Sequence, residues 1–382
     1  MRLLVLGASL GGLRTAQAVR RAGLDAEVTL VGAEAVLPYD RPPLSKDFLR
    51  GARQASDLAL ASQDELDELG VSLRLGRTAT ALDSVRQVVD LDDGSALEYD
   101  ALVIATGSRP RTLPGGHVPT DLHTLRTIDD ATALRDRLAR SSSLAVIGGG
   151  FIGSEIASTA RGLDIDVTIV EPAGTLMLRA LGETIGQHMT HLHLRENVDI
   201  KAGVSVERVT DTGGRQLIEL SDGATILADT TVVGIGAIPN IDWLQGSGLT
   251  LSDGVLCGPD LRAVGTTNVF GIGDVARWLH PRYDRYIRVE HWTSVAEQAR
   301  VVAANLAGQP TVADALPYVW SDQLGSRLQI AGVVPVDPMV EYAVGQPGTD
   351  RFVALLSDAS GPQAVVGRGA VRDFLAHRAE LG

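Results

Sequence analysis

Short apolar runs alternate with amphipathic stretches along this chain, and the first alternation starts close to residue 1. Leu3–Leu6 is uniformly apolar, which is typical of a strand buried on both faces of a sheet. It is followed by the turn Gly7-Ala8-Ser9-Leu10-Gly11-Gly12, a helical pattern over Leu13–Arg21, a strand pattern over Glu27–Val31, and Glu34. The pattern predicts a strand, a glycine-rich turn, a helix and a parallel strand that ends near an acid.

The same order of patterns returns in the middle of the chain. Leu144–Ile147 predicts a strand, and the turn Gly148-Gly149-Gly150-Phe151-Ile152-Gly153 follows it. A helical stretch over Ser154–Gly162 and a strand over Asp166–Val170 come next, with Glu171 directly after them. Each copy spans about 30 residues and matches the dinucleotide-binding pattern. One glycine fingerprint is a weak signal, but two copies in the same context predict two Rossmann-type modules.

The rest of the chain predicts β-rich connections and a small terminal module. The stretches Gly70–Asp100 and Gly203–Ile226 are rich in turns and short β-like runs. Further strands are expected in or after these stretches and in the last part of the chain, together with one more helix. These elements are Val71–Leu75, Gln87–Leu91, Ala101–Ala105, Thr231–Ile235, Asn268–Ile272, the helix Ser294–Leu306, Arg327–Gly332 and Phe352–Leu356. The texture changes at Gly308-Gln309-Pro310, where a domain boundary is expected.

The predicted fold class is therefore α/β, with two Rossmann-type dinucleotide-binding domains and a small C-terminal α+β domain. The strand at Asn268–Ile272 looks like the returning edge of the first module. The first domain is then discontinuous, over residues 1–110 and 236–307, and the second, over 111–235, is inserted into it. Residues 308–382 form the third, interface domain.

Composition and charge narrow the possible partners. The chain has 382 residues, 45% of them hydrophobic, which is enough for several buried sheets. It has 34 Lys and Arg against 47 Asp and Glu, a net charge of −13. A field of that sign opposes binding to nucleic acid, so no nucleic-acid partner is expected.

Cysteine count and hydropathy bear on redox chemistry and location. Cys257 is the single cysteine, so one chain cannot form an internal disulfide or use a redox-active cysteine pair. The first apolar run breaks at Gly7, too early for the core of a signal peptide. No run of about 18 apolar residues predicts a transmembrane helix. We expect a cytoplasmic protein with no membrane partner, as a monomer or weak homodimer.

The two glycine turns are candidate phosphate cradles. Each presents backbone N–H groups and a helix N-terminus, which favour a negatively charged pyrophosphate. Gly7 and Gly148 permit the tight turn, and Gly150 lets the backbone approach the phosphate, whereas Ser9 stands at that position in the first turn. Ordinary turns between strand and helix are the alternative interpretation.

An acid ends the second strand of each module. A carboxylate accepts hydrogen bonds from a ribose 2′-OH and repels a 2′-phosphate, so Glu171 favours NADH over NADPH. Glu34 is the corresponding acid of the first module. For both, a solvated loop carboxylate is the alternative.

The segment Pro38-Tyr39-Asp40-Arg41-Pro42-Pro43-Leu44-Ser45-Lys46 is the sharpest single motif. It resembles the signature of the FAD-dependent ferredoxin reductases of oxygenase electron-transfer chains, the putidaredoxin reductase and Rieske dioxygenase reductase type. The resemblance covers nearly the whole chain, through Ala105-Thr106-Gly107, Leu125-Arg126-Thr127, the segment from Gly148 to Glu155, Gly234 to Asn240, Gly271 to Asp274, Arg288 to Trp292 and Trp320 to Gln323.

The resemblance implies a glutathione-reductase-like architecture, FAD in the first domain and NADH in the second. It assigns FAD contacts to Gly7, Ser9, Leu10, Gly11, Gly12, Glu34, Arg41, Lys46, Ala79, Ala105, Thr106, Gly107, Arg126, Gly273, Asp274, Glu290, His291 and Trp292. It assigns NAD contacts to Gly148, Gly150, Phe151, Ile152, Gly153, Glu155, Glu171 and Gly236. It implies no metal site.

The resemblance also implies particular roles at the flavin. Lys46 is the expected cation beside flavin N5 and O4, steadied by Glu155. Asp274 is expected on the ribityl chain, and the helix that starts near Thr293 is expected to point its positive end at the N1–C2=O edge. Trp320 is expected near the exposed dimethylbenzene edge, facing an iron–sulfur partner. A core aromatic of the third domain is the alternative.

Two implied contacts lie on the adenosine half, and the chain departs from the family pattern elsewhere. Arg126 is expected on the diphosphate or adenosine side, and the backbone of Ala79 on the adenine. Ala33 stands where an Asp is common, and Gly367-Arg368-Gly369-Ala370 replaces an Asn-containing turn in a terminal module that looks shortened around Glu341–Gly369.

Two further features are interpreted as structural. His188, His191 and His193 lie on a helical stretch without an accompanying carboxylate ligand set, so they are expected to be exposed helix residues and not metal ligands. Cys257 is expected to be a small buried residue.

The leading functional hypothesis is an NADH-dependent reductase that delivers electrons through FAD to a [2Fe–2S] ferredoxin, which serves a cytochrome P450 or a Rieske oxygenase. A rubredoxin or quinone reductase, or an NADH oxidase or peroxidase of the same architecture, is the alternative, although oxidases, peroxidases and disulfide reductases need a cysteine near the flavin that is missing here. A flavoprotein of the apoptosis-inducing type needs a basic surface, which the net charge opposes. The basic cluster Arg277, Arg282, Arg285 and Arg288 suggests a docking surface for an acidic ferredoxin, or else a solvated hairpin.

Overall fold

A computed structural model describes residues 1–113 and 122–382 and divides the chain into two compact units. The first unit contains Met1–Asp40, Leu58–Arg109 and Ile238–Pro317, and the second contains Arg41–Asp57, Pro110–Ala237 and Tyr318–Gly382. Two of the crossings fall within the short paired strands β8 (Ser108–Pro110) and β16 (Ala237–Pro239). The division into three functional domains stays a prediction.

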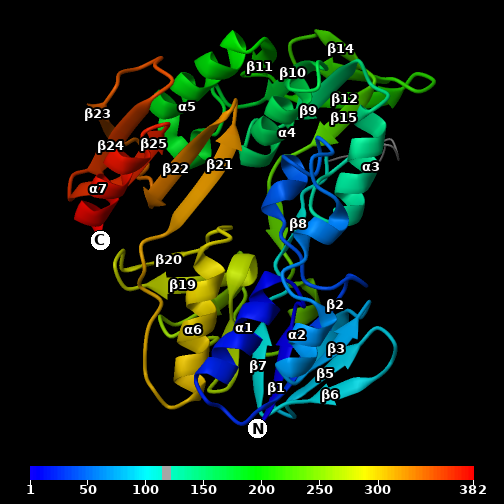
Figure 1. Cartoon of the computed structure of the whole chain (residues 1–382), viewed down its shortest axis with the longest axis vertical. Coiled ribbons are helices and arrows are strands. Elements are labelled where there is room, and N and C mark those ends of the chain that lie inside the picture. Colours follow the sequence, from blue (N-terminus) through cyan, green and yellow to red (C-terminus); the bar gives the residue numbers. More distant parts are fainter. Residues whose placement is uncertain (114–121) are drawn as a thin grey trace. The chain divides into compact units, whose positions relative to one another are not determined.

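A five-stranded parallel sheet forms the centre of the first unit (Figure 1). Its order is β18-β7-β1-β2-β3, made of Val269–Gly271, Ala101–Ile104, Arg2–Leu6, Glu27–Gly32 and Val71–Leu75. The apolar runs that predict β1 and β7 are buried, as expected for strands covered on both faces. Helix α1 (Leu10–Arg21) makes the crossover from β1 to β2, and α6 (Ser294–Leu306) packs against it.

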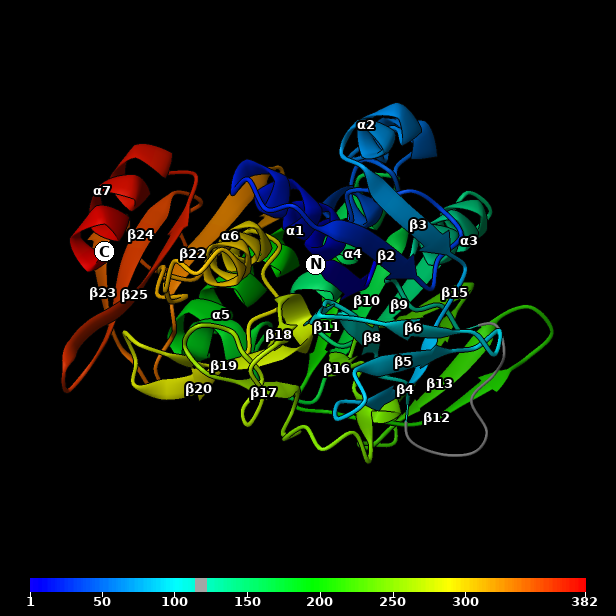
Figure 2. The same cartoon turned by 90° about the horizontal axis from the view of Figure 1, so that it is seen from below.

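The other strands of the first unit form two small sheets. The antiparallel sheet β4-β5-β6 lies together in Figure 2, and the second sheet has the order β17-β19-β20. Helix α2 (Gln63–Glu68) starts at a capping box in which Ser62 and Glu65 bond reciprocally. The strands are Ala79–Asp83, Val88–Leu91, Ala96–Glu98, Val255–Cys257, Ala276–His280 and Arg285–Ile287.

The second unit repeats the parallel design. The sheet order is β11-β10-β9-β15, made of Val198–Ala202, Asp166–Glu171, Ser143–Ile147 and Thr230–Val233. Helix α4 (Phe151–Arg161) makes the crossover from β9 to β10, and α5 (Leu178–Arg195) and α3 (Ile128–Leu138) complete the helices of this part. The antiparallel sheet β12-β13-β14 contains Val206–Asp211, Gln216–Leu220 and Thr225–Ala228.

The C-terminal part of the second unit is a five-stranded antiparallel sheet followed by helix α7 (Val371–Leu381). The order is β21-β22-β25-β24-β23, made of Tyr318–Gln323, Ser326–Gly332, Gly361–Arg368, Phe352–Asp358 and Met339–Val344. Ile156 of α4, Leu181 of α5, Leu328 of β22 and Phe352 of β24 belong to one buried cluster. A shared core therefore joins this sheet to the helices of the second parallel sheet.

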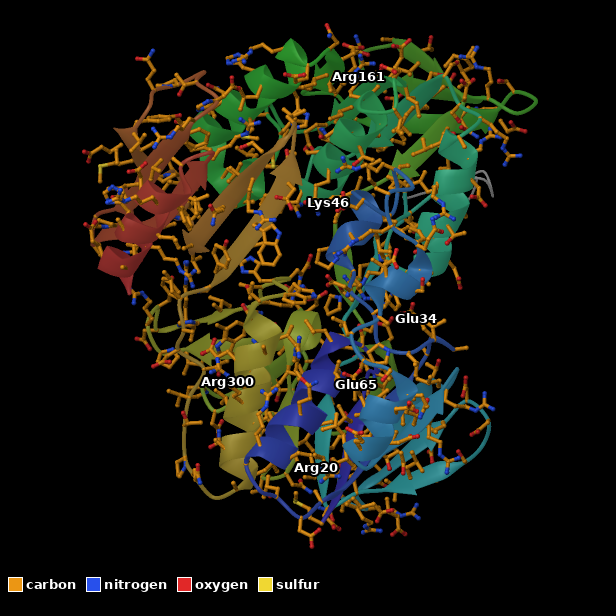
Figure 3. The ribbon with its side chains drawn as sticks, in the orientation of Figure 1. Arg20, Glu34, Lys46, Glu65, Arg161 and Arg300 are labelled. Atoms are coloured by element: carbon orange, nitrogen blue, oxygen red, sulfur yellow. The ribbon has the colours of Figure 1, made fainter. Side chains whose placement is uncertain are left out.

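Each module has an arginine in the last turn of its crossover helix, Arg20 on α1 and Arg161 on α4, both labelled in Figure 3. Arg20 and Arg161 both stand thirteen positions after the first glycine of their turn. Arg20 donates to the carbonyls of Leu69 (2.7 Å) and Ala26 (2.8 Å). Arg161 donates to those of Glu196 (3.3 Å) and Ile165 (2.8 Å). In both cases one arginine satisfies a carbonyl at the end of the next helix and one just before the next strand.

The part of the chain that the structure describes also contains four 3₁₀ helices, at Pro42–Ser45, Ala55–Leu58, Asp242–Leu244 and Gly273–Val275. Within residues 1–113 and 122–382, the helices are too short or too polar to cross a bilayer.

Candidate functional site

The candidate residues of the first unit gather at one edge of its sheet. Gly7 follows β1, Glu34 follows β2, Ala105–Gly107 follow β7, and Gly273–Asp274 follow β18. Because all five strands are parallel, their carboxyl ends meet at the same edge. In open α/β sheets this edge is where nucleotide ligands bind.

The first glycine turn has the geometry of a diphosphate cradle. Gly7 has φ +118°, and its N–H donates to the carbonyl of Val31 (2.7 Å). A side chain at Gly7 would collide with the carbonyl oxygen of Ala105, so only glycine fits here. Ser9 is the N-cap of α1 in an extended conformation, and its hydroxyl does not cap the helix. The first N–H groups of α1, which carries Leu10, Gly11 and Gly12 in its first turn, therefore suit the phosphates of a bound dinucleotide.

The other candidate side chains of this edge are held by neighbours from the same unit. Tyr39 donates its hydroxyl proton to Glu34 (2.6 Å), and Ser108 donates to Asp274 (2.9 Å). Thr106 donates to the carbonyl of Asn240 (3.1 Å). Ala79 begins β4, opposite Leu91 of β5.

The start of α6 is a second polar feature of the first unit. The helix begins at Ser294 with Thr293 as its N-cap, directly after Glu290, His291 and Trp292. Nδ1 of His291 is buried without a hydrogen-bond partner among the described residues, and burial lowers the pKa of His291 to about 4. A neutral imidazole with an unsatisfied nitrogen fits a site that a polar ligand completes.

The basic cluster expected to dock a ferredoxin stays a prediction, but Arg288 is not a surface cation available to it. Its side chain is only 14% exposed and pairs with Asp253 (3.1 Å) and Glu290 (2.7 Å). It also donates to the carbonyl of Asp274 (3.3 Å). The positive charge of Arg288 is thus balanced within the first unit, because its guanidinium pairs with two carboxylates.

The second unit has the equivalent edge. Gly148 follows β9, Glu171 ends β10, and Gly236 lies beyond β15. Gly148 has φ +105°, and Gly150 is the N-cap of α4, which carries Phe151, Ile152 and Gly153 in its first turn. A side chain at Gly150 would meet no atom within 4 Å, so the surface in front of the helix N-terminus is open.

Glu171 is tied to the glycine turn by its own carboxylate. One oxygen accepts the N–H of Gly149 (2.7 Å) and the other accepts the N–H of Ala173 (2.9 Å). Each oxygen retains a lone pair for a ribose hydroxyl. The residues present therefore fit a second dinucleotide that has a free 2′-hydroxyl.

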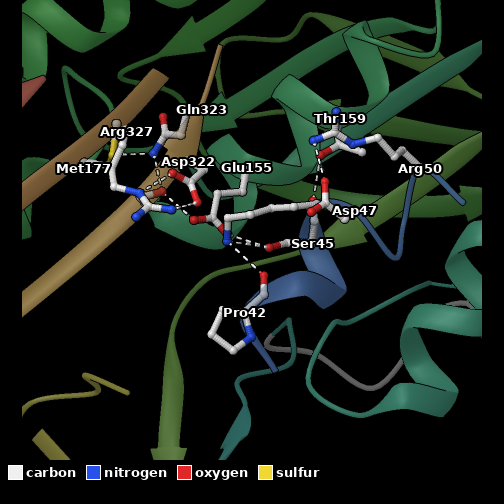
Figure 4. Close-up of polar contacts among 12 residues, drawn as sticks. Pro42, Ser45, Asp47, Arg50, Glu155, Thr159, Met177, Asp322, Gln323 and Arg327 are labelled. Atoms are coloured by element: carbon white, nitrogen blue, oxygen red, sulfur yellow. Dashed lines mark hydrogen bonds and ion pairs between the residues drawn. The ribbon is translucent and has the colours of Figure 1, made fainter. Parts of the chain in front are cut away.

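Lys46 and Glu155 form a buried ion pair in the second unit. Lys46 follows the 3₁₀ helix Pro42–Ser45, and Glu155 lies on α4; their side chains are 12% and 4% exposed, with Nζ 2.6 Å from Oε2. Lys46 also donates to the carbonyl of Pro42 (3.0 Å) and to Oγ of Ser45 (3.3 Å) (Figure 4). All three ammonium hydrogens have acceptors, so the cation has a defined position.

Arg41 and Arg126 meet in the same unit, since the guanidinium of Arg41 donates to the carbonyl of Arg126. The N–H of Arg126 in turn donates to Asp130 (2.9 Å) in the capping box that starts α3. The first unit thus contains the candidate FAD residues other than Arg41, Lys46 and Arg126, and the second unit contains those three, Trp320 and the candidate NAD residues.

Trp320 lies on β21 and is partly exposed. The guanidinium of Arg327 stands 5.3 Å from the centre of its ring, and the ring of Tyr318 is 6.0 Å away. A surface position stacked by a cation differs from the core position that was the alternative for this residue.

Two of the three helix histidines are not as expected, whereas His191 is exposed as predicted. His188 and His193 are buried, at 2% and 0% exposure, because the C-terminal sheet packs over α5. His188 bonds to the hydroxyl of Tyr342 (3.0 Å) and the carbonyl of Thr349 (2.8 Å). Cys257 is buried as expected, and burial raises the pKa of its thiol to about 12.

Three polar residues around Glu155 were missed by the sequence interpretation. Ser45, Ser321 and Gln323 are at most 2% exposed and belong to its hydrogen-bond network. Ser321 and Gln323 alternate along β21, the strand that carries Trp320. This alternation of polar residues is the sequence signal that could have identified them.

The comparisons with known proteins agree with this arrangement. The family model described as pyridine nucleotide-disulphide oxidoreductase matches residues 1–299. The ferredoxin–NAD(+) reductase component of the anthranilate 1,2-dioxygenase system of Burkholderia cepacia is 36% identical over 367 residues, covering 96% of this chain and 87% of the relative. Putidaredoxin reductase of Pseudomonas putida is 36% identical over 338 residues, covering 87% and 80% of the two chains.

The fold is also found among solved structures. The covalent complex of putidaredoxin reductase with putidaredoxin matches with a TM-score of 0.94 and 31% identity, over 100% of this chain and 92% of that chain. The predicted α/β fold class, with its glutathione-reductase-like architecture and C-terminal α+β part, is thereby confirmed.

Proposed function

Because this chain belongs to the pyridine nucleotide-disulphide oxidoreductase family, we propose that it is an NADH-dependent flavoprotein reductase that passes electrons through FAD to a [2Fe–2S] ferredoxin. The ferredoxin in turn serves a cytochrome P450 or a Rieske oxygenase. The resemblance inferred from the motifs is confirmed by relatives that carry the names of such reductases.

The single observation that carries this proposal is the state of the only cysteine. Disulfide chemistry needs an accessible thiolate beside the flavin. Cys257 is completely buried and its thiol pKa is raised, so it stays protonated at neutral pH. With no cysteine for thiol chemistry, the reduced flavin needs an external acceptor, and the named relatives work with ferredoxins.

The first unit supplies the proposed FAD site. Gly7 and the N-terminus of α1 take the diphosphate, Glu34 takes the adenosine ribose and Asp274 the ribityl chain. The bound flavin would supply the exchange between two-electron transfer from NADH and single-electron transfer to an iron–sulfur centre. The start of α6 adds positive potential where reduced flavin is negative.

The second unit supplies the proposed NADH site. The turn at Gly148–Gly153 takes the diphosphate and Glu171 takes the ribose. A 2′-phosphate would stand against a carboxylate that accepts two backbone N–H groups, and that carboxylate could rotate away only by losing these bonds. This arrangement favours NADH over NADPH.

Lys46 and Glu155 form the proposed electrostatic element of the flavin site. The ammonium offers positive charge to the flavin N5 and O4 side, and Glu155 keeps it in place. Trp320 is proposed to face the ferredoxin.

Reduction of a panel of acceptors by the purified protein tests the proposal. With NADH as donor, [2Fe–2S] ferredoxins should be reduced efficiently, and NADPH should support a much lower kcat/KM. Rubredoxin, small quinones, peroxide and disulfides complete the panel. Turnover restricted to peroxide or disulfides, or equal use of both nucleotides, would contradict the corresponding part.

A further inference from the structure

The carboxylate of Glu155 is held at both oxygens by three residues from two other segments of the second unit. Oε2 accepts from Lys46 (2.6 Å) and from the hydroxyl of Ser45 (2.5 Å). Oε1 accepts from the hydroxyl of Ser321 on β21 (2.5 Å). Figure 4 shows Glu155 between the segment of Ser45 and the strand of Gln323. A carboxylate fixed at both oxygens cannot rotate about its last bond without losing a bond.

Ser321 is itself oriented by a buried neighbour. Nε2 of Gln323 donates to Oγ of Ser321 (2.8 Å) and contacts Sδ of Met177 (3.5 Å). Since a carboxylate oxygen only accepts and an amide nitrogen only donates, the hydroxyl proton of Ser321 must point to Glu155.

The chain of bonds continues to α5 with its direction equally determined. The amide oxygen of Gln323 lies 2.9 Å from Nε2 of His193. That oxygen only accepts, so the imidazole carries its proton on Nε2. His193 is fully buried, and burial lowers its pKa to about 4, which keeps the ring neutral.

The backbone around Glu155 is anchored at the same places. The N–H of Leu324, at the end of β21, donates to the hydroxyl of Ser158 (2.7 Å). Thr159 donates to the carbonyl of Ser45 (2.7 Å). Successive residues of α4 thus fix the strand of Ser321 on one side and the segment of Lys46 on the other.

We propose that Ser321 and Gln323 are positioning residues of the electron-transfer site, which act through Glu155 to fix the ammonium of Lys46. This proposal rests on the proposed function, in which Lys46 lies beside the flavin. Strand β21 then has two roles. One face carries Trp320 at the surface, and the other face braces the ion pair.

Because the chain has few lysines, the environment of the Lys46 ammonium can be measured directly. Lys46 and Lys201 are the only two lysines. Lys201 is 41% exposed and pairs with Asp199 on β11, away from Glu155 in sequence and contacts. Flavin-loaded protein labelled with ¹³C,¹⁵N-lysine therefore gives two lysine side-chain signals, and the Lys201→Arg variant identifies them.

Ser321→Ala is expected to broaden or displace the Lys46 signal and leave the Lys201 signal in place. In stopped flow it is expected to slow NADH-dependent flavin reduction about tenfold with little change in the KM for NADH, as one lost hydrogen bond to a charged group implies. Ser321→Thr retains the hydroxyl and should restore both readouts. Ser326→Ala, the same truncation on the next strand, is the matched control and should resemble wild type.

A wild-type Lys46 signal and wild-type rates in Ser321→Ala would overturn the proposal. If that variant does not fold, Gln323→Leu tests the proposal instead, since it removes the hydrogen bond that orients Ser321. An unchanged Lys46 signal in Gln323→Leu would also overturn the proposal. If NADH fails to reduce even the wild-type flavin, the proposed function is wrong. The lysine signals still decide whether Ser321 and Gln323 fix the position of Lys46.

Discussion

Lysine is used sparingly in this protein, and one of its two lysines stands in a buried ion pair. All other members of the 34 lysine and arginine residues are arginines. A compact ammonium presents its charge at one point, whereas a guanidinium spreads it over a plane that needs more room. Lys46, with acceptors at Pro42, Ser45 and Glu155, sits where a small point charge is required.

Removing one partner of this pair should cost more than removing both. Lys46→Met leaves Glu155 buried without its cation, and we expect a loss of about 3 kcal/mol in unfolding free energy. Glu155→Gln in the same chain removes the stranded charge and should recover most of that loss. Chemical denaturation of the two single variants and the double variant measures the coupling. Strictly additive losses would show that the pair contributes no interaction energy.

His193 should make stability depend on pH in a defined window. Its folded pKa is about 4 and its ordinary value 6.5, so between these pH values the unfolded chain binds a proton that the native protein does not. Stability therefore falls as the pH is lowered from about 6.5 to about 4, by up to about 3 kcal/mol. His193→Gln keeps a donor for Gln323 and should flatten this part of the curve. Parallel curves for variant and wild type would contradict the assignment.

At the residue scale, the sequence predicted those parts of the site that belong to motifs. The Lys46–Glu155 pair followed from the resemblance, and the structure places the two side chains in contact. Ser321 and Gln323 were not predicted as site residues, because serine and glutamine on a strand usually face solvent. His188 and His193 were wrongly expected to be exposed, since a helical pattern does not say which sheet packs on it.

The glycine turns are the elements on which cofactor binding depends, and they are equivalent in their bonds. The N–H of Gly7 bonds to the end of β2 (2.7 Å) and that of Gly148 to the end of β10 (2.8 Å). In each, the glycine has a positive φ that a side chain would strain.

Alanine at each turn should therefore separate the two cofactors. Gly7→Ala should yield protein that fails to retain flavin. Gly148→Ala should stay yellow but bind NADH at least about tenfold more weakly, given the strain of a non-glycine residue there. Gly162→Ala, at the helical C-cap of α4, is the control and should keep both ligands. Flavin content and NADH titration measure the outcome. Loss of the same ligand from both turn variants would contradict separate sites.

At the element scale, apolar runs predicted the strands of the first parallel sheet and three of the four strands of the second to within one or two residues, whereas β11 was not predicted. They did not predict the partners of every strand. Val71–Leu75 was grouped with the β-rich connection, yet it is the edge strand β3 of the first parallel sheet, because pairing depends on the crossover and not on local pattern. The segment Arg41–Asp57 follows the first module in sequence but belongs to the second unit, where Leu49 enters the core.

The whole molecule is an acidic protein with a net charge of −13, so its partner surface has to rely on local features. Trp320 is the candidate for such a feature because its ring is partly exposed beside Arg327. Aromatic residues and arginine are the side chains that most often dominate protein interfaces.

Trp320→Ala should slow reduction of a [2Fe–2S] ferredoxin about tenfold, the usual size of an interface anchor's effect, and leave flavin reduction by NADH unchanged. Stopped-flow measurement of each half-reaction separates the two steps. Wild-type rates in both steps would mean that Trp320 only packs against Tyr318 and Arg327.

The two glycine turns are proposed to hold FAD and NADH in one electron-transfer protein, a claim that can be checked by anaerobic titration of the purified protein with NADH. The yellow protein should bleach with about one equivalent of NADH, and its colour should return when an oxidised [2Fe–2S] ferredoxin is added. A colourless protein that takes up no added FAD, or a yellow one that NADH does not bleach, would contradict the claim.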